Sequence, residues 1–439
     1  MLPDDPSRET GSWPSATGSG VGRSHGTSRT TPFDRWFRYP AGFASDYVGM
    51  LLDQMGVTEG TVTDCFTGSG VTGTAARQRG LNFTGIEAHP LIAELAALKL
   101  RNPAPAPNEI IAAGEHLSTA TESALRAKRG RDISDETSLV TRSFTPPALL
   151  ALLELRDRIQ VETWSETLPY LKWALLGTLR DVAAVKVGWP YQRPGIARVP
   201  KHPDVVARFQ ERLQFMADDL TGLDEASSFT SVVVSGDSRS ADAWSVIPTT
   251  AQACVSSPPY LNNFDYADAT RLELYFWGEV RTWRDMCLGV RSDMITATTQ
   301  QSSKGDKTAA VDLLKRDNHA PDKKVVALVD ELARLRKERS GRAKEYDQVV
   351  PSYFVAMKSV LGNLYDHLDP GSPALWLVGD SAPYGVYIDT PGLIGQFAQE
   401  QGFEVKEDVI LRQRGNRWST NAGRTQAKLS ERVLVLRRP

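Results

Sequence analysis

The chain has 439 residues, enough for two or three domains or for one domain with a large insertion. The chain has 51 Lys and Arg against 53 Asp and Glu, a net charge of −2. This balance argues against a protein that coats nucleic acid, but it does not exclude a local basic cleft. The 3 cysteines are far apart, so we expect neither disulfides nor a metal site. We find no apolar run of the ~20 residues that a membrane span needs and no signal-peptide pattern, so we expect a cytoplasmic protein with no membrane partner.

The N-terminal segment differs in composition from the rest of the chain. Residues 1–32 are rich in Ser, Gly, Thr and Pro and contain almost no large apolar side chains. Because such a segment cannot bury enough surface to offset its ordering entropy, we predict a disordered tail. An aromatic stretch follows at 36–43 and leads into a helical pattern that Gly56 ends.

A strand–turn–helix–strand pattern comes next. The strand 61–66 runs into a glycine turn at 67–70, a small-residue helix covers 71–79, and a second strand at 82–86 ends at Glu87. This order is a βαβ unit, which predicts an α/β fold with a parallel sheet.

The middle of the chain has a different pattern. Residues 108–226 are mostly helical, never clearly strand-like, and contain a polar, Pro-rich loop at 188–203. We therefore predict a helical insertion at 108–226 that divides one sheet domain into the parts 33–107 and 227–439. Further strands are predicted at 230–234, 252–256, 374–378, 405–411 and 431–437, the last two pairing as a hairpin.

The glycine turn is a candidate ligand site. Gly68 and Gly70, beside Phe66, allow a sharp turn and a close approach of a ligand beyond the strand end. The turn lacks both the third glycine of the dinucleotide fingerprint and the Lys-Ser/Thr of a phosphate loop, so a ligand without a pyrophosphate fits better. Acids at strand ends could accept hydrogen bonds from an adenosine group, and these are Asp64, Glu87 and Asp237. For Asp237 a simple loop cap is an open alternative.

A Ser-Pro-Pro-Tyr turn follows the apolar strand 252–256. Its two prolines, Pro258 and Pro259, fix the backbone and remove two donors. The Ser257 hydroxyl and the Pro258 carbonyl could then accept both hydrogens of an NH2 group, which would localise the lone pair of its nitrogen. Tyr260 offers a flat face on which an extruded base could stack, and extrusion is needed because the amino group is not reachable inside a duplex.

These two motifs resemble those of the amino-methyltransferases of DNA, the cytosine-N4 and adenine-N6 enzymes. Residues 64–70 resemble their cofactor motif, residues 257–260 their catalytic motif, and the aromatic stretch 36–43 the segment that contacts the methionine part of the cofactor. The resemblance implies a Rossmann-like class I methyltransferase sheet, S-adenosylmethionine as cofactor and DNA as partner. It also implies that the insertion is a target-recognition region, and that Tyr39 and Pro40 belong to the cofactor site.

Two further groups are candidates for substrate contact. Asn262, Asp265 and Tyr266 follow the catalytic motif and could line the base pocket, or could merely be polar loop residues before a helix. Arginines and an aromatic residue in the loop between the last two strands suit contact with phosphates, and the candidates are Arg414, Arg417 and Trp418.

Ser257 favours cytosine N4 as the methylated position, because the serine form of the motif is associated with that group of enzymes. Three alternatives stay open: an adenine-N6 enzyme, an RNA or protein amide methyltransferase, and a catalytically silent nucleic-acid-binding subunit. A restriction or defence-system protein is a further candidate partner.

Overall fold

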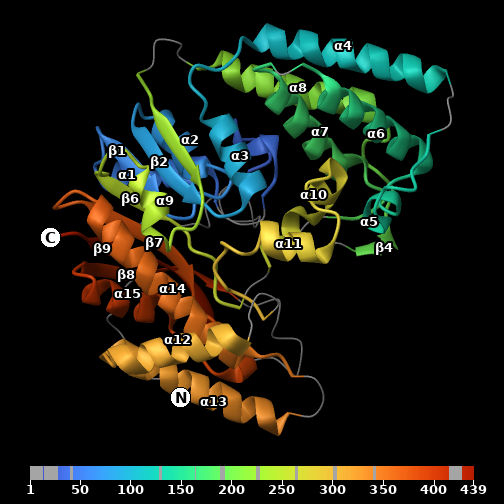
Figure 1. Cartoon of the computed structure of the whole chain (residues 1–439). Coiled ribbons are helices and arrows are strands. Elements are labelled where there is room, and N and C mark those ends of the chain that lie inside the picture. Colours follow the sequence, from blue (N-terminus) through green and yellow to red (C-terminus); the bar gives the residue numbers. More distant parts are fainter. Residues whose placement is uncertain are drawn as a thin grey trace.

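A computed structural model gives the arrangement of the chain (Figure 1). It describes residues 13, 28–39, 43–127, 131–163, 165–187, 193–223, 228–262, 265–299, 304–339, 343–414 and 428–439. Most of the predicted tail therefore lies outside the described residues. Within the described part, no helix combines the length and the apolar character that crossing a membrane requires.

A seven-stranded sheet forms the centre of the protein, in the order β5-β2-β1-β6-β7-β9-β8. Its first five strands in that order are mutually parallel, and β9 runs antiparallel to both of its neighbours. The strands are β1 (Thr61–Asp64), β2 (Asn82–Glu87), β5 (Ser231–Ser235), β6 (Ala253–Ser256), β7 (Pro373–Gly379), β8 (Glu404–Arg414) and β9 (Leu429–Arg437). The predicted α/β fold, its parallel sheet and the terminal hairpin are confirmed.

Helices cover both faces of the sheet, because alternate side chains of each buried strand point to opposite faces. Leu375 and Leu377 of β7 pack in one core with α1 and α2, whereas Trp376 and Val378 pack in another with α14 and α15. The helices that accompany the sheet are α1 (Ser45–Gln54), α2 (Val71–Arg77), α3 (Pro90–Lys99), α9 (Ala241–Ser245), α14 (Tyr346–His367) and α15 (Thr390–Glu400).

The insertion forms a third hydrophobic core, which continues into α3 and α10. In Figure 1 its helices lie together at the upper right, beside the sheet. Its elements are α4 (Pro107–Arg126), α5 (Ser138–Thr141), α6 (Pro146–Val161), α7 (Leu168–Val182), β3 (Val185–Lys186), β4 (Arg193–Ala197) and α8 (Val205–Thr221).

Two short 3₁₀ turns, η1 and η2, each precede a helix. A 3₁₀ turn, η1 (Asp34–Trp36), precedes α1, and another, η2 (Asp268–Thr270), follows the Ser-Pro-Pro-Tyr turn. The remaining elements are α10 (Arg271–Trp277), α11 (Trp283–Gly289), α12 (Lys304–Asp317), α13 (Ala320–Glu338) and η3 (Pro383–Gly385).

One prediction for the insertion is wrong in part. Residues 188–203 were expected to be a loop in a region without strands, but β4 pairs antiparallel with β3 in a separate two-stranded sheet. The proline in β4 (Arg193–Ala197) led to the prediction of a loop, because proline is common in loops and rare inside strands.

Candidate active site

The order of the strands creates a switch point between β1 and β6. From β1 the chain moves outward to β2 and β5, and then returns to β6 on the other side of β1. The register pairs Val62 with Ala253 and Thr63 with Cys254, so β1 and β6 end side by side. Ligands of open α/β sheets bind at such a point, beyond the carboxyl ends of the strands. Both sequence motifs begin there.

The glycine turn owes its shape to two left-handed residues. Gly68 has φ 53° and Gly70 has φ 83°, values that favour glycine. A Cβ on Gly70 would also meet the Ala96 backbone of α3 at 3.1 Å, so this glycine lets the turn pack against that helix. The ring of Tyr39 lies beside Gly68, 3.9 Å from where a Cβ would stand.

Glu87 holds the glycine turn from the end of β2. One carboxylate oxygen accepts from the Gly68 N–H at 2.7 Å and the other from the His89 N–H at 2.8 Å. Burial raises the pKa of Glu87 to about 7, although both backbone hydrogen bonds lower it. A carboxylate has about four acceptor sites, so these two bonds leave capacity for ligand hydroxyls.

Asp64 ties the two motifs together. Its carboxylate accepts from the Ser256 hydroxyl at 2.6 Å, the Thr72 hydroxyl at 2.7 Å and the Phe66 N–H at 3.0 Å. Ser256 directly precedes the Ser-Pro-Pro-Tyr turn, and Thr72 opens the helix after the glycine turn. Burial raises the pKa of Asp64, and the two hydroxyl donors oppose that shift. The side chain is 3% exposed, so it acts first as a link between β1, α2 and β6.

Ser257 is oriented by the neighbouring strand. Its hydroxyl donates to the Leu377 carbonyl of β7 at 3.1 Å. A hydroxyl that gives its only hydrogen to a carbonyl retains two lone pairs and can then only accept further hydrogen bonds. The structure thus turns Ser257 into an acceptor, which is the property needed to bind an amino group.

Tyr260 is fixed at both ends. Its backbone N–H donates to the Tyr266 hydroxyl at 3.1 Å, and its phenol donates to the carboxylate of Glu431 on β9. Glu431 also pairs with Arg412 of β8. The ring is therefore held in one orientation while remaining partly exposed, as a stacking surface requires.

The segment after the Ser-Pro-Pro-Tyr turn contains a buried ion pair. Asp265 pairs with Arg291, their side chains being 1% and 5% exposed, and it also accepts from the Ala267 N–H. Asn262 has φ 60° and donates its backbone N–H to the Ala297 carbonyl at 2.7 Å. Of the three predicted pocket residues, Tyr266 touches the catalytic motif directly.

Tyr39 lies beside the glycine turn and close to the loop that follows the Ser-Pro-Pro-Tyr turn. It is 3% exposed. Burial raises the pKa of its phenol well above the ordinary value, and the charges of Glu87 and Asp265 add to that rise. The aromatic segment before α1 thus reaches both the acid at the end of β2 and the loop after Ser-Pro-Pro-Tyr.

The remaining predicted site residues either have another partner in the structure or lie outside its described part. The Asp237 carboxylate accepts from the backbone and guanidinium of Arg239, as its loop-cap alternative describes. Pro40, Arg417 and Trp418 lie outside the described residues, as does the side chain of Arg414. Their expected roles stay predictions.

Several residues that support the site carried no sequence signal. The buried Lys99 of α3 donates to the Ser69 carbonyl of the glycine turn at 2.9 Å, and burial lowers its pKa to about 8. Leu377, Glu431 and Arg291 were missed as well. Their signal is purely spatial, since each reaches the site from another strand or loop.

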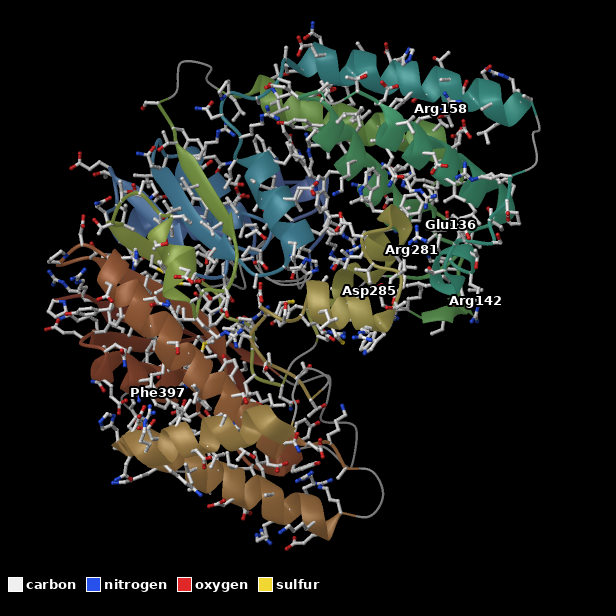
Figure 2. All side chains as sticks on the ribbon, viewed as in Figure 1. Glu136, Arg142, Arg158, Arg281, Asp285 and Phe397 are labelled. Carbon is white, nitrogen blue, oxygen red and sulfur yellow. The ribbon has the colours of Figure 1, made fainter. Side chains whose placement is uncertain are left out.

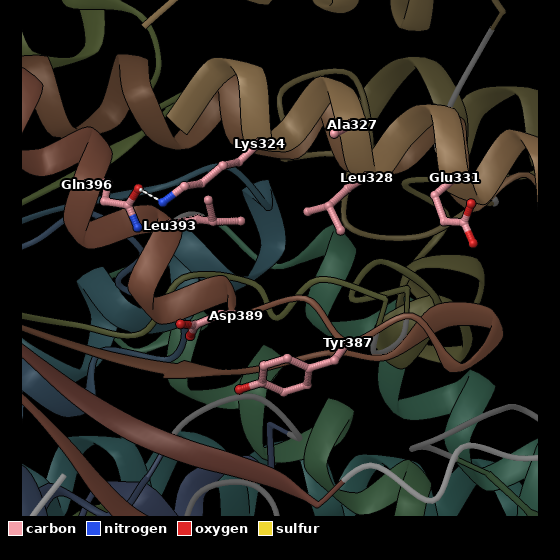
Figure 3. A pocket seen from close by; sticks show the side chains of 8 residues that line it. All are labelled: Lys324, Ala327, Leu328, Glu331, Tyr387, Asp389, Leu393 and Gln396. Atoms are coloured by element: carbon pink, nitrogen blue, oxygen red, sulfur yellow. Dashed lines mark hydrogen bonds between the residues drawn. The ribbon is translucent and has the colours of Figure 1, made fainter. Parts of the chain in front are cut away.

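A cavity of about 440 Å³ lies elsewhere, against α13 and α15 (Figure 3). Its lining combines Leu328 and Leu393 with charged residues such as Lys324 and Glu331. None of its lining residues belongs to either motif. The candidate site therefore rests on the switch point and not on this cavity.

Comparison with known proteins adds a distant relationship. No family model matches the chain. It is similar to the type II methyltransferase M.BsoBI of Geobacillus stearothermophilus, with 22% identity over 91% of this chain and 84% of that one. A shorter match, with 27% identity over 42% of this chain and 38% of theirs, is to the type II methyltransferases M.AvaI of Nostoc sp. and Anabaena variabilis.

Solved structures add no further support. The rRNA methyltransferase aviRa from Streptomyces viridochromogenes aligns over 92% of this chain and 85% of that chain, but with a TM-score of 0.29 and 9% identity. A superposition at that level carries no conclusion. Fold and sequence together define a mostly parallel α/β protein with distant homology to type II methyltransferases.

Proposed function

We propose that this protein transfers a methyl group from S-adenosylmethionine to an exocyclic amino group of a base in DNA, with cytosine N4 as the favoured position. One observation carries the proposal: the Ser-Pro-Pro-Tyr turn begins beside the glycine turn, linked to it by the Ser256–Asp64 hydrogen bond at 2.6 Å. A methyl donor on one turn and a base on the other would then meet at the switch point. The distant homology to type II methyltransferases agrees with this chemistry.

The residues around the glycine turn fit the cofactor. Glu87 retains acceptor capacity for ribose hydroxyls, and the left-handed turn at Gly68 presents backbone rather than a side chain. The Ser69 hydroxyl is buried and has no hydrogen-bond partner within the described residues, so a polar partner from a ligand would satisfy it. When bound, S-adenosylmethionine supplies a methyl group activated by its sulfonium.

The catalytic turn would make the amino nitrogen nucleophilic. Ser257 would act as an acceptor because its own hydrogen is engaged by Leu377, and the Pro258 carbonyl would be the second acceptor. Two acceptors for the two N–H hydrogens withdraw the nitrogen lone pair from the ring π system. Tyr260, oriented by Glu431, would stack on the extruded base.

The preference for cytosine rests on Ser257. A neutral hydroxyl is a weaker acceptor than a carboxylate, and serine at this position resembles the cytosine-N4 enzymes. Adenine N6 uses the same acceptors and is the second candidate.

The test is product analysis. The protein is incubated with methyl-labelled cofactor and unmethylated genomic DNA, and the DNA is digested to nucleosides. We expect label in N4-methylcytosine, whereas label in N6-methyladenine alone would move the assignment to adenine. Transfer to RNA or protein, with none to DNA, would overturn the proposal.

A further inference from the structure

Arg180 of α7 lies where the insertion meets two segments of the candidate site. Its guanidinium donates in three directions: to Glu273 of α10 at 2.6 Å, to the Arg38 carbonyl at 2.7 Å and to the Ala269 carbonyl of η2 at 2.7 Å. It also lies over the Phe37 ring, with its central carbon 4.2 Å from the centroid. A rigid planar fork suits such a junction, because each N–H has a fixed direction.

The first of these segments carries Tyr39. The Arg38 carbonyl belongs to the peptide group that leads directly into Tyr39, the residue beside Gly68. The insertion holds the same segment at a second point, where Asp219 of α8 accepts from the Phe33 N–H and the Trp36 indole, both at 2.8 Å. The position of Tyr39 thus depends on α7 and α8.

The second segment carries the predicted base pocket. Ala269 lies three residues after Tyr266, whose hydroxyl accepts from the Tyr260 N–H. Thr270, the next residue, shares a 2.6 Å hydrogen bond with His89, and the His89 N–H donates to Glu87. The η2 turn is therefore joined to the catalytic turn through Tyr266, two residues before it, and to the acid at the end of β2 through His89.

We propose that Arg180 is a positioning residue that couples the insertion to both halves of the active site, by fixing the Arg38 and Ala269 carbonyls at once. The inference rests on the proposed function, since it gives the insertion a role in assembling the cofactor and base sites. Movement of α7 on target binding would then reach Tyr39 and the loop after the catalytic turn together.

A double variant tests this role without leaving a buried charge. Arg180→Met combined with Glu273→Gln removes the ion pair as a unit, because breaking only one side strands the other charge. We expect faster amide hydrogen exchange in residues 33–39 and 266–270. We also expect the dissociation constant for S-adenosylhomocysteine to rise about tenfold, as when the binding-competent fraction falls to a tenth.

The insertion offers a closely matched control. Arg156 of α6 pairs with Glu136, donates to the Phe276 carbonyl at 2.9 Å and lies over the Phe276 ring. Its side chain is 13% exposed and that of Arg180 is 15% exposed. Figure 2 shows Glu136 among the side chains of the insertion, away from the sheet. Arg156→Met with Glu136→Gln should leave exchange in 33–39 and cofactor affinity unchanged.

Two single variants separate the ion pair from the carbonyl bonds. Glu273→Gln alone leaves the Arg180 charge without its carboxylate and should lower the global stability, but it keeps both carbonyl bonds, so exchange in 33–39 and 266–270 should not rise relative to the rest of the chain. Arg180→Lys keeps a positive charge near Glu273, but one ammonium cannot replace the guanidinium bonds to both carbonyls. Amide exchange in both segments should therefore also be faster in this variant. Arg180→Lys also provides the test if the double variant fails to fold.

The inference would be overturned if amide exchange in 33–39 and 266–270 were equally fast in the Arg180 and Arg156 double variants, or if it changed in neither. The exchange measurement needs neither cofactor nor DNA. If the wild type bound no cofactor and methylated no DNA, the proposed function would fail, while the exchange rates would still decide the role of Arg180.

Discussion

The two turns at the switch point differ in how far along the chain the partners of their side chains lie. In the glycine-turn region the Thr72–Asp64, Gly68–Glu87 and Lys99–Ser69 hydrogen bonds span 8, 19 and 30 residues, and Asp64 adds a long-range bond to Ser256. The Ser257 and Tyr260 side chains of the catalytic turn are oriented from farther away, since the Ser257–Leu377 and Tyr260–Glu431 bonds span 120 and 171 residues.

The two turns are therefore supported by different parts of the fold. Most hydrogen bonds of the glycine turn come from β1, α2, β2 and α3, which follow one another along the chain. The catalytic turn needs β7, β8 and β9 in register before Ser257 and Tyr260 are oriented. Changes on the two sides should therefore affect cofactor binding and turnover separately.

The largest effect is expected at Tyr260. Tyr260→Ala removes the stacking face, worth ~1–3 kcal/mol per base, so turnover should fall up to about a hundredfold. Cofactor affinity, measured by calorimetry, should stay at the wild-type value because Tyr266 and Glu431, which orient Tyr260, both lie outside the glycine turn. Tyr260→Phe keeps the ring but loses the hydrogen bond to Glu431, so its turnover should lie between those of the wild type and Tyr260→Ala. Wild-type turnover in Tyr260→Ala would remove this residue from the site.

The next effect is expected at Ser257. Ser257→Ala removes one acceptor for the amino group, and kcat should fall about tenfold, which corresponds to ~1.4 kcal/mol, within the range for one hydrogen bond. The matched variant is Ser256→Ala one residue earlier, which breaks the link to Asp64 instead. That variant should lower both cofactor affinity and kcat. If Ser257→Ala weakened cofactor binding as much as Ser256→Ala does, the separation of the two turns would not hold.

The glycine-turn side should respond to pH through Glu87. Its pKa of about 7 in the free protein is raised by burial, and hydroxyl donors from a ligand favour the charged carboxylate. Cofactor affinity should therefore rise about tenfold from pH 6 to pH 8 and then level. The same raised pKa stabilises the fold at low pH, and that contribution is lost as pH rises through 7. Glu87→Gln should flatten the affinity profile; an unchanged slope in this variant would assign the titration to another group.

The smallest effect is expected at Lys99. Lys99→Met keeps the length of the side chain but loses the hydrogen bond to the Ser69 carbonyl, so cofactor affinity should fall about fivefold. Turnover at saturating cofactor should be unaffected, which distinguishes a support of the glycine turn from a support of the catalytic turn. A fall in kcat with unchanged cofactor affinity would reverse that assignment.

The same contrast explains how far the sequence alone could lead. The sheet, its helices and both turns were predicted because alternation of apolar residues, glycine turns and paired prolines are local signals. Ser257 and Tyr260 were identified, but the acceptor role given to Ser257 by Leu377 depends on a strand contact that no local pattern encodes. Arg180 was missed for the same reason: it is one of many helix arginines until α7 packs beside Arg38 and Ala269.

Asp64 and Asp237 show a second limit. Both were predicted as cofactor ligands from their place at strand ends; Asp64 also begins the motif 64–70, and for Asp237 a loop cap stayed open as an alternative. In the folded chain Asp64 accepts from three donors of the protein, and Asp237 is engaged by Arg239. Position at a strand end identifies which acids lie at the ligand edge, whereas the hydrogen-bond partners decide which of them retain capacity for a ligand.

We propose one active site, formed by the glycine turn and the Ser-Pro-Pro-Tyr turn at the switch point between β1 and β6. A crystal structure with S-adenosylhomocysteine would show whether the two turns share a ligand. We expect the ligand against Gly68, with its ribose on Glu87 and its sulfur facing the turn that Ser257 begins. Binding at any other place, including the cavity beside α13 and α15, would refute a shared site.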